Sequence, residues 1–572
     1  MRGRGVLDKL KHRFRKGMLR DIVSETAWIY RHTRAYRKAI ALYLLLGLAS
    51  TLLGIVLALL SKELINTIVS AASGRRIFAL GATVVSVSTV NILLSALTSR
   101  FSAKVNLRIA NEMRAEVFGV LLDTQWQALQ PFHSGDLLSR IQNDASTVAA
   151  SVLGWLPTLI IKATQFLASL VVILINDPTM ALFALLCAPL TLLVAKPYVK
   201  KMRAMSRETR EAGSRLVSFH EEALQNVQSI KAFQLSDAFR ARLDRVQAEY
   251  YDVSVAFNRF SVLNSAFLSF CSMLAGYLCL GWGAYRLWLG KIDFGTMVLF
   301  IQLASYLSAA MTALIKLVPS AVECTTAAGR VMAVLSLPRE DLRDTQAAQA
   351  LRPAALSLHL SGLCFSYRKD APVLKDVSLS VAAGETIALV GASGSGKTTL
   401  FRLLLGLLTP TGGTAEVTDG TRRLALSPAT RCLFSYVPQD NVIFSGTVED
   451  MLRLVRPQAT QEELLAALRV ACAEEFVLAL PQGLQTPLSE RGGTLSVGQN
   501  QRLAIARAVL ADAPILLFDE ITSALDRQTE ERVLKNLAAL PNKTCILATH
   551  RPSALSLCDR VCRLHDNHLE EE

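Results

Sequence analysis

The stretch Gly391-Ala392-Ser393-Gly394-Ser395-Gly396-Lys397-Thr398 matches the phosphate-binding pattern G-x-x-x-x-G-K-[ST] at every fixed position. The residues before it, Thr386–Val390, form an apolar run typical of a buried strand, and Thr399–Leu405 is predicted to be a helix. The three glycines let the backbone turn tightly, so that its N–H groups point at phosphate oxygens beside a helix N-terminus. We expect Lys397 to reach the outer phosphates and the Thr398 hydroxyl to bind Mg²⁺.

A second buried strand is predicted directly before two carboxylates. The run Ala513–Phe518 is continuously apolar, and Asp519 and Glu520 follow it. A strand that ends in two acids behind a phosphate loop is typical of a site for Mg²⁺ and an attacking water. We expect Asp519 to belong to the Mg²⁺ shell and Glu520 to polarise the water as a general base. The two motifs together indicate hydrolysis of a nucleoside triphosphate.

The two motifs lie in a C-terminal region of alternating strands and helices. Hydropathy falls after about residue 340, residues 341–356 have the composition of a linker, and the strand–loop–helix pattern then runs through 357–572. This alternation predicts an α/β nucleotide-binding domain of the P-loop NTPase type.

The first half of the chain has a different composition. The whole protein has 572 residues, a mean hydropathy of +0.34 and a formal net charge of +14. Between 39 and 340, uncharged or nearly uncharged runs recur, each long enough to cross a hydrocarbon core of roughly 30 Å as a helix. They predict an all-α membrane domain with six spans, at about 39–60, 77–99, 150–176, 178–198, 260–285 and 294–315.

The positive charges predict how these spans are oriented. The N-terminal segment 1–38 and the long connections 100–144 and 196–259 carry 29 lysines and arginines, whereas the short loops carry five. The positive-inside rule therefore places the N-terminus and both long connections in the cytoplasm, and it explains much of the net charge without nucleic acid. Within 1–38 we expect an interfacial elbow helix at Ser24–Tyr30. The long connections are expected to be helical extensions that turn near 122–134 and 225–232, each with a short helix able to dock onto another domain.

A few polar side chains fall inside the predicted spans, where burial is costly and often functional. Lys162 stands out because none of the six runs contains an acid that could pair with it. Two interpretations remain open: Lys162 lines a cavity that meets an anionic or amphipathic cargo, or it reaches cytoplasmic water. The possible substrate-cavity residues are Asn91, Lys162, Gln165, Asn264 and Gln302.

The order of these features resembles the ATP-binding cassette exporter family, in the half-transporter arrangement of six spans followed by one nucleotide-binding domain. The resemblance covers nearly the whole chain and implies roles for further residues. It implies catalysis by Glu520 and His550, Mg²⁺ binding by Thr398 and Gln439, and a loop after the catalytic carboxylate that contains Asp526. Glu490–Gly492 resembles the element that touches the cytoplasmic connections. The nucleotide-binding residues that it implies are Tyr367, Gly391, Ala392, Ser393, Gly394, Ser395, Gly396, Lys397, Thr398, Thr399, Gln439 and Asp519.

The family signature is matched by Leu495-Ser496-Val497-Gly498-Gln499, expected at the start of a helix Val497–Leu510. A hydroxyl and backbone N–H groups at a helix N-terminus point at an anion. The resemblance implies that Ser496, Val497, Gly498 and Gln499 act in trans, on a nucleotide held by a second subunit. Val497 replaces the usual glycine, and its Cβ is expected to crowd that position. The chain also stops at Glu572 soon after the last expected strand, so the terminal helices common in this family are expected to be short or missing.

The function that the resemblance implies is ATP-driven export of an amphipathic small molecule, lipid or peptide by alternating access. ATP and Mg²⁺ are the expected cofactors, and ATP is hydrolysed at sites shared between two nucleotide-binding domains. The expected partners are a second half-transporter, in a homodimer or a heterodimer, the lipid bilayer and the substrate, with no nucleic acid. The expected location is the bacterial inner membrane, with the nucleotide-binding domain in the cytoplasm.

Two alternatives of other classes remain open from the sequence. The same fold is compatible with an ATP-driven importer or an ATP-gated regulator, and the direction of transport in vesicles separates these from an exporter. A soluble DNA-organising ATPase also carries a phosphate loop and a signature. That alternative requires residues 39–315 to be soluble without detergent, which their hydropathy opposes.

Overall fold

The computed structural model describes residues 28–571 apart from 30, 72, 133, 369–370, 440–442 and 489–494; within its helices, the side chains of 184–200 and some other residues are also not described. The chain divides into two compact units. The first contains the chain up to Gly119 together with Ser134–Leu335, and the second contains Val120–His133 together with Ser336–Glu572. The predicted elbow helix lies mostly outside the described residues, as does Glu490–Gly492.

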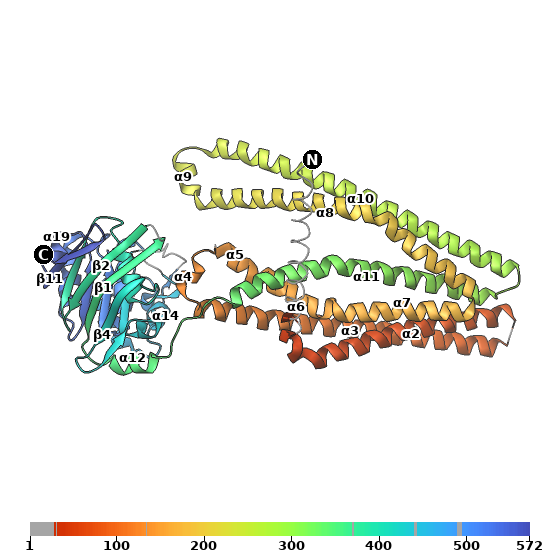
Figure 1. The fold of residues 1–572 in the computed structure, drawn as a ribbon, viewed down its shortest axis with the longest axis horizontal. Helices are drawn as coiled ribbons and strands as arrows, with labels where there is room; N and C mark the ends of the chain where they lie inside the picture. The colour runs from red at the N-terminus through yellow and green to blue at the C-terminus, as the bar shows by residue number, and fades with distance from the viewer. Residues whose placement is uncertain are drawn as a thin grey trace, which may run out of the picture. The chain divides into compact units, whose positions relative to one another are not determined.

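The first unit is entirely helical in its described residues (Figure 1). Long apolar runs leave the backbone no satisfactory arrangement in lipid except a helix, which pairs its own N–H and C=O groups. The elements are η1 (Thr33–Tyr36), α2 (Arg37–Val69), α3 (Gly74–Asp123), α5 (Ser134–Ser139), the π-helix η2 (Arg140–Asp144), α6 (Ala145–Gly154), α7 (Leu156–Asn176), α8 (Pro178–Gln225), α9 (Val227–Ala232), α10 (Ser236–Trp288) and α11 (Phe294–Leu335).

Among the described residues, four stretches are long and apolar enough to cross a membrane: Arg34–Val69, Gly74–Asp123, Ser134–Asn176 and Phe294–Leu314. They contain the predicted first, second and third spans and all but the last residue of the predicted sixth span. The predicted fourth and fifth spans lie inside α8 and α10. In α8 the side chains of 184–200 fall outside the described residues, and in α10 a few do. Six spans therefore stay a prediction, supported by the lengths of α8 and α10, which have 48 and 53 residues.

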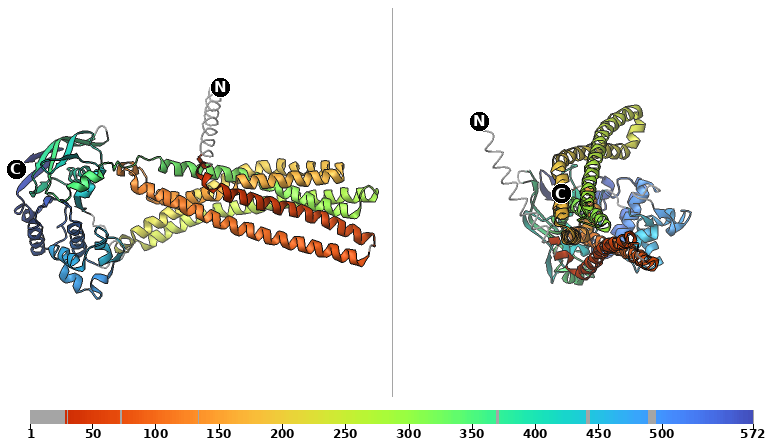
Figure 2. Two further views of the ribbon diagram at one scale, coloured as in Figure 1. Left: turned by 90° about the horizontal axis from the view of Figure 1, so that it is seen from below. Right: turned by 90° about the vertical axis from the view of Figure 1, so that its right-hand side faces the viewer.

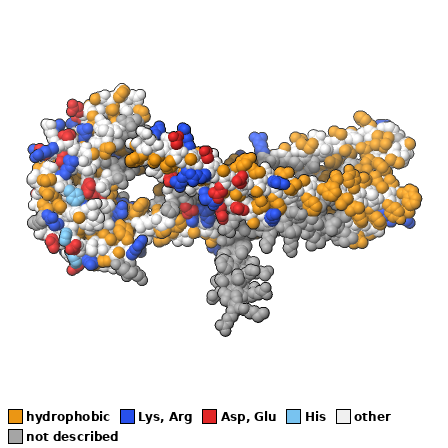
Figure 3. Space-filling model, turned by 90° about the horizontal axis from the view of Figure 1, so that it is seen from above, with side chains coloured by type: hydrophobic (Ala, Val, Ile, Leu, Met, Phe, Trp, Pro, Cys, Tyr) orange, Lys and Arg blue, Asp and Glu red, His pale blue; other side chains and the backbone are white. Residues whose placement is uncertain are grey.

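The helices of the first unit pack as antiparallel rods. α8 and α10 lie side by side and are joined through the short helix α9, and α11 packs against α2 and α7 (Figures 1 and 2). Met180, Phe300 and Leu303 belong to the buried core where these helices meet. Hydrophobic side chains cover the end of the rods that carries the short turns, at the right of Figure 3, whereas charged side chains gather nearer their other ends. This division matches a lipid-embedded part and a water-exposed part.

Polar contacts hold the short turns between the rods. Asp177 is almost fully buried and accepts hydrogen bonds from Arg286 and from the N–H and hydroxyl of Thr179. Lys62 donates to Asn176 at 2.6 Å. These contacts join α2, the α7–α8 turn and the end of α10 at one place in the unit.

The second unit is built on a six-stranded sheet with the order β12-β11-β3-β10-β9-β6. Five neighbouring strands are parallel and β12 is antiparallel at the edge. Every residue of β9 and β10 is buried, as expected for central parallel strands covered on both faces. A four-stranded antiparallel sheet has the order β2-β1-β4-β5. The strands are β1 (Ser357–Arg368), β2 (Ala371–Val381), β3 (Thr386–Val390), β4 (Gly412–Thr418), β5 (Arg423–Ala425), β6 (Phe434–Val437), β7 (Gly446–Thr447), β8 (Pro487–Leu488), β9 (Ile515–Asp519), β10 (Thr544–Ala548), β11 (Arg560–His565) and β12 (His568–Glu571).

The helices of this unit pack around the two sheets. They are α4 (Trp126–Leu129), α12 (Thr345–Leu351), α13 (Lys397–Leu404), η3 (Pro428–Leu433), α14 (Val448–Arg453), α15 (Gln461–Val470), α16 (Glu474–Leu478), η4 (Gly483–Gln485), α17 (Val497–Leu510), α18 (Arg527–Ala538) and α19 (Pro552–Leu555). The stretch 341–356, predicted as a linker, contains the short helix α12. Ala348 and Leu351 of this helix are fully buried in a hydrophobic core cluster of the second unit, and these apolar contacts order the segment.

Two short helices occupy the turns predicted at 122–134 and 225–232. They are α4 and α9, and α4 clusters with the second unit although α3 before it belongs mostly to the first. The chain beside α4 forms an antiparallel bridge between Thr124 and Arg339. The first turn is thereby held against the segment that leads into the nucleotide-binding region.

Candidate functional site

The phosphate-loop motif forms the connection from β3 to α13, as the sequence predicts. Gly394 and Gly396 have φ angles of +83° and +109°, which only glycine adopts readily. A Cβ at Gly391 would lie 2.5 Å from the carbonyl oxygen of Leu564, so this position also excludes a side chain. The Oγ of Ser395 is buried and has no hydrogen-bond partner among the described residues. An open turn with an unsatisfied hydroxyl, at a helix whose first N–H groups lack acceptors, fits a phosphate group.

Lys397 opens α13 and is 6% exposed. Its ammonium donates to the carbonyl oxygens of Gly391 at 2.7 Å and Ala392 at 3.1 Å, and its Nζ lies 3.2 Å from Nε2 of His550. Burial lowers the pKa of Lys397, while the nearby carboxylates of Glu520 and Asp519 act in the opposite direction. A buried cation held by two carbonyl oxygens beside His550 is suited to bind an anion that enters the loop.

The hydroxyl of Thr398 donates to Oδ2 of Asp519 at 2.7 Å, and the phenol of Tyr436 donates to the same oxygen at 3.5 Å. Burial raises the pKa of Asp519, and the adjacent Glu520 adds to this effect, whereas Thr398 and Lys397 oppose it. A hydroxyl and a carboxylate at one point form a hard oxygen donor set, which suits Mg²⁺. Tyr436 was not identified from the sequence, because nothing local marks it as a neighbour of Asp519.

Glu520 lies at the end of β9 with a φ of +52°, an unfavourable value for a residue with a side chain. Its N–H donates to the carbonyl of Ala548 at 3.0 Å, which fixes the backbone. Its carboxylate accepts a hydrogen bond from the amide of Gln439 at 3.0 Å and lies 3.4 Å from Nε2 of His550. The three side chains therefore meet in the structure, and they come from the ends of the neighbouring strands β6, β9 and β10.

Tyr367 is 44% exposed at the end of β1 and packs edge-on against Phe365, with ring centroids 4.9 Å apart. Its hydroxyl lies 3.4 Å from Oγ1 of Thr399 and accepts from Arg402 at 3.4 Å. An exposed aromatic face held beside the phosphate loop can stack on a nucleobase. Arg402 is a further neighbour of this surface that sequence reasoning missed, although its position on the same helix as Lys397 could have indicated it.

The signature residues begin α17 at the predicted position. Ser496 caps the helix through a capping box, with its hydroxyl accepting from the N–H of Gln499 and the Gln499 side chain accepting from the N–H of Ser496. Val497 is 66% exposed, so within this chain its Cβ crowds nothing large. A Cβ at Gly498 would lie 2.8 Å from the carbonyl oxygen of Ala524, which makes this glycine necessary for the close approach of α17 to the loop before Asp526.

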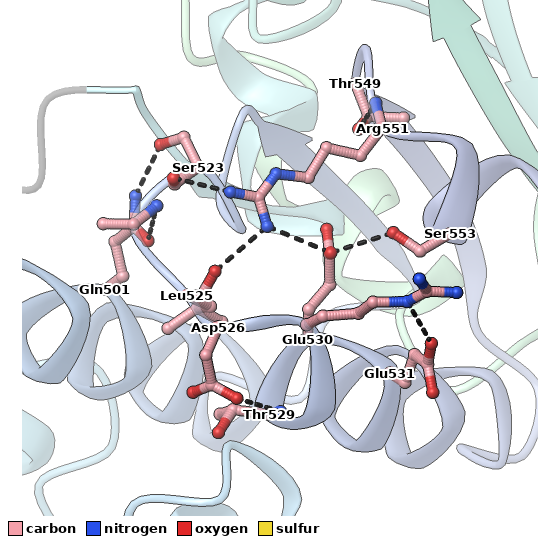
Figure 4. A network of polar contacts seen from close by, with 12 residues as sticks. Gln501, Ser523, Leu525, Asp526, Thr529, Glu530, Glu531, Thr549, Arg551 and Ser553 are labelled. Carbon is pink, nitrogen blue, oxygen red and sulfur yellow. Dashed lines mark hydrogen bonds and ion pairs between the residues drawn. The ribbon is translucent and has the colours of Figure 1, made fainter.

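The loop Ser523–Asp526 is held from two sides, as Figure 4 shows. Gln501, which is 2% exposed on α17, donates to the Ser523 hydroxyl at 3.0 Å and accepts from the N–H of Ala524 at 3.1 Å. Asp526 then caps α18 by accepting from the N–H of Thr529. The loop is thereby tied to the helix that the signature opens.

Arg551, the residue after His550, holds the same loop from the other side (Figure 4). Its guanidinium donates to the carbonyls of Ser523 at 2.8 Å and Leu525 at 3.0 Å and to the buried carboxylate of Glu530 at 3.0 Å. Neither Gln501 nor Arg551 was identified from the sequence. The only local signal for Arg551 is its place beside His550.

The predicted cavity residues lie in the first unit. Asn91 accepts a hydrogen bond from the Ser50 hydroxyl at 2.8 Å, and Lys162 donates to Gln165 at 2.9 Å. Asn264 is 8% exposed, and Gln302 is half-buried on α11. Among the residues that the structure describes, the bond from Lys162 to Gln165 is the one hydrogen bond that joins two of these five side chains. Their joint role in a cavity stays a prediction.

Two family models match the chain. Residues 40–311 match the ABC transporter transmembrane region, and residues 374–523 match the ABC transporter model. Proteins of Staphylococcus aureus strains NCTC 8325 and COL that carry the name multidrug export ATP-binding/permease protein are each 29% identical over 441 residues, which is 76% of this chain and 76% of each relative.

A solved structure of a bacterial Atm1-family ABC exporter with ATP bound is similar in fold. Its TM-score is 0.77 at 23% identity, over 94% of this chain and 95% of that chain. The likeness confirms the predicted fold class, a helical membrane domain followed by a mixed α/β nucleotide-binding domain.

Proposed function

Because the chain belongs to the ATP-binding cassette (ABC) exporter family, we propose that it exports an amphipathic molecule by alternating access. The family makes it a half-transporter and a multi-pass membrane protein whose ATP hydrolysis is coupled to transport. The observation that carries the proposal is the meeting of Lys397, Asp519 and Glu520 with Gln439 and His550 at the carboxyl ends of neighbouring parallel strands, the usual place for a ligand in such a sheet. The soluble alternative is excluded by the membrane region.

Different residues of this chain would bind the phosphates, the base and Mg²⁺ during hydrolysis. The N–H groups of the loop from Gly391 and the Lys397 ammonium hold the phosphates, and Tyr367 stacks on the base. Thr398, Asp519 and Gln439 would hold Mg²⁺, which when bound neutralises charge on the terminal phosphates. The donor set described above fits this ion.

Glu520 is the proposed general base. Its carboxylate is positioned by the Gln439 amide at 3.0 Å and by His550 at 3.4 Å, so it is held ready to accept a proton from a water molecule. His550 also lies beside Lys397, where its ring can contact the phosphate that leaves. The left-handed backbone at Glu520 supports a functional role, because such strain is retained mainly at sites that use it.

The nucleotide is proposed to lie between two copies of the chain. Ser496 and the first N–H groups of α17 form an anion-binding helix start, and Val497 beside them is 66% exposed. An exposed helix start of this kind supports a contact with ATP on a second half-transporter. The family fold implies such dimerisation, and we propose a homodimer because one chain carries every motif of an active site.

The proposed organisation follows the sequence boundaries: a cytoplasmic segment 1–38, a membrane domain 39–340, a linker 341–356 and a nucleotide-binding domain 357–572. The N-terminus and the nucleotide-binding domain are proposed to lie in the cytoplasm, since the positive charges flank the spans on that side. The relatives occur in bacteria, which supports the cell membrane as the location.

The substrate is proposed to be amphipathic, because the relatives are named for multidrug export and Lys162 is a lone cation in a predicted span. The test is ATP hydrolysis by the full chain in lipid nanodiscs, measured across a panel of lipids, peptides and drugs. Stimulation by amphipathic compounds is expected, and Lys397→Ala should abolish both basal and stimulated turnover. Uptake into inside-out vesicles would indicate export, and uptake only into right-side-out vesicles would indicate an importer.

A further inference from the structure

Glu340 and Arg431 form a two-pronged ion pair in the second unit, away from the nucleotide site. The two Nη atoms of Arg431 donate to the two carboxylate oxygens of Glu340, at 2.8 and 3.1 Å. The Glu340 side chain is 11% exposed and that of Arg431 is 36% exposed. In a bidentate pair with one partner nearly buried, two parallel hydrogen bonds fix the orientation of both side chains. A surface pair with a single contact lacks this constraint.

Arg431 is also joined to the helix that starts at the phosphate loop. Its Nε donates to the carbonyl oxygen of Leu405 at 3.0 Å, at the C-terminal end of α13. A Cβ at Gly406 would lie 2.5 Å from the carbonyl carbon of Ser427, so the start of η3 abuts the end of α13. Because η3 carries Arg431, this packing adds to the hydrogen bond that joins Arg431 to the C-terminal end of α13. The other end of α13 carries Lys397 and Thr398.

Glu340 is joined to the ends of two long helices. Its N–H donates to the carbonyl of Asp123, the last residue of α3, at 2.8 Å. The N–H of Gln125 donates to the carbonyl of Pro338 at 3.0 Å, three residues after the end of α11 at Leu335. The ends of α3 and α11 are therefore connected to each other and to Glu340 through the backbone.

We propose that Arg431 and Glu340 form a clasp that carries a displacement of α13, caused by nucleotide at its first turn, to the Asp123 end of α3 and the Leu335 end of α11. Both are positioning residues, since neither contacts the nucleotide site. The inference rests on the proposed function, because it assumes that nucleotide changes the membrane helices. The ion pair between Arg431 and Glu340 would carry part of the change that nucleotide causes in the membrane helices.

The test is hydrogen–deuterium exchange of the full chain in lipid nanodiscs, without nucleotide and after trapping with Mg²⁺-ATP and vanadate. In the wild type, nucleotide should change exchange both around the phosphate loop and in peptides of α3 and α11. In Arg431→Glu the change around the loop should remain, while the change in α3 and α11 should fall to about half or less. Arg431→Lys keeps the positive charge but cannot make the two parallel hydrogen bonds, so it should reduce the helix response by less than Arg431→Glu. It replaces Arg431→Glu in the test if that variant does not fold.

Exchanging the charges of Arg431 and Glu340 separates an effect on the helix response from an effect on the stability of the fold. The double variant Arg431→Glu with Glu340→Arg should recover more of the helix response than either single variant. Arg456→Glu is the matched control, since Arg456 forms a 2.8 Å pair with Glu463 elsewhere in the same unit, and it should leave the helix response intact. A wild-type helix response in both Arg431 variants, with normal protection of the loop, would overturn the clasp. A wild type whose α3 and α11 do not respond to nucleotide would contradict the proposed function itself, and the clasp with it.

Discussion

The hydroxyl of Thr398, in the first turn of α13, donates a hydrogen bond of 2.7 Å to the carboxylate of Asp519 at the end of β9. The two residues are 121 positions apart in the chain, and the parallel alignment of β3, β10 and β9 brings them together. This contact joins the phosphate loop to the acidic pair, and it brings two candidate Mg²⁺ ligands to one point.

Burial of Asp519 predicts a pH-dependent stability. Its pKa in the folded protein is raised above 3.8, so the folded state loses stability as pH rises from the unfolded pKa through the folded one. Asp519→Asn removes the buried charge and keeps an acceptor for Thr398. Without nucleotide, the variant should unfold at a higher temperature than the wild type near neutral pH, and this gain should vanish at about pH 4.

The control for this effect is Asp419→Asn, which should act in the opposite direction. Hydrogen bonds from the N–H of Arg422 and from Thr421 lower the pKa of Asp419 to about 2. Its ionised form therefore stabilises the fold above an unfolded pKa of about 3.8, and this stabilisation is lost as pH falls toward 2. Equal shifts for both variants at every pH would show that burial of Asp519 is not the cause.

Glu520→Gln should retain ATP and lose turnover. Glutamine keeps the contacts with Gln439 and His550 but cannot accept a proton, so hydrolysis should fall about 10²- to 10⁴-fold while binding persists. Phosphate release and retention of ATP on a dimer, measured by size-exclusion chromatography, check both parts. Glu531→Gln on α18 is the control, because that carboxylate faces Arg527 at the surface. Hydrolysis at the wild-type rate in Glu520→Gln would refute the assignment of the base.

Val497→Gly should lower the KM for ATP, whereas Gly498→Ala should lower kcat. The Val497 side chain is exposed, so it crowds nothing large within its own chain. Its removal would make room only for nucleotide held by a second copy, and the KM for ATP should therefore fall. Alanine at position 498 meets the Ala524 carbonyl at 2.8 Å, so it should displace the loop before Asp526 and reduce kcat. Steady-state hydrolysis measures both. An unchanged KM in Val497→Gly would indicate that this side chain does not face the nucleotide.

Arg551→Met should destabilise the protein through Glu530. The Glu530 carboxylate is almost fully buried, and the substitution leaves it without its cation. The expected loss is about 2–4 kcal/mol, somewhat below the range for a fully buried pair because Arg551 is one-third exposed. Chemical denaturation measures the loss, and adding Glu530→Gln should recover part of it.

Arg527→Ala is the matched control for Arg551→Met, since Arg527 pairs with Glu531 at the surface of α18, the helix that carries Glu530. Its effect on stability should stay within about 0.5 kcal/mol. A loss as large as that of Arg551→Met would mean that the buried carboxylate is not the cause.

The sequence by itself determined the local features of this protein. The spacing of glycines and Lys397 set the phosphate loop, and Ser496 with Gln499 set the start of α17, because a turn or a cap depends on a few neighbouring residues. The uncharged runs marked the long helices, and the ends of their charged extensions marked the turns that became α4 and α9. The family resemblance also marked Gln439 as a Mg²⁺ ligand and His550 as a catalytic residue, whereas their contacts with Glu520 appear only in the structure.

Only the tertiary structure decided which distant residues meet. The order of the parallel strands brings Lys397 to His550 and Tyr436 to Asp519, and the approach of α17 to the loop before Asp526 explains Gly498. Gln501, Arg431 and Glu340 carry no local signal, and Arg551 has only its place beside His550, because each acts through a partner far away in the chain. Short-range hydrogen bonding and hydropathy can be read along a sequence, whereas side-chain pairs across a sheet depend on packing that the whole chain must complete.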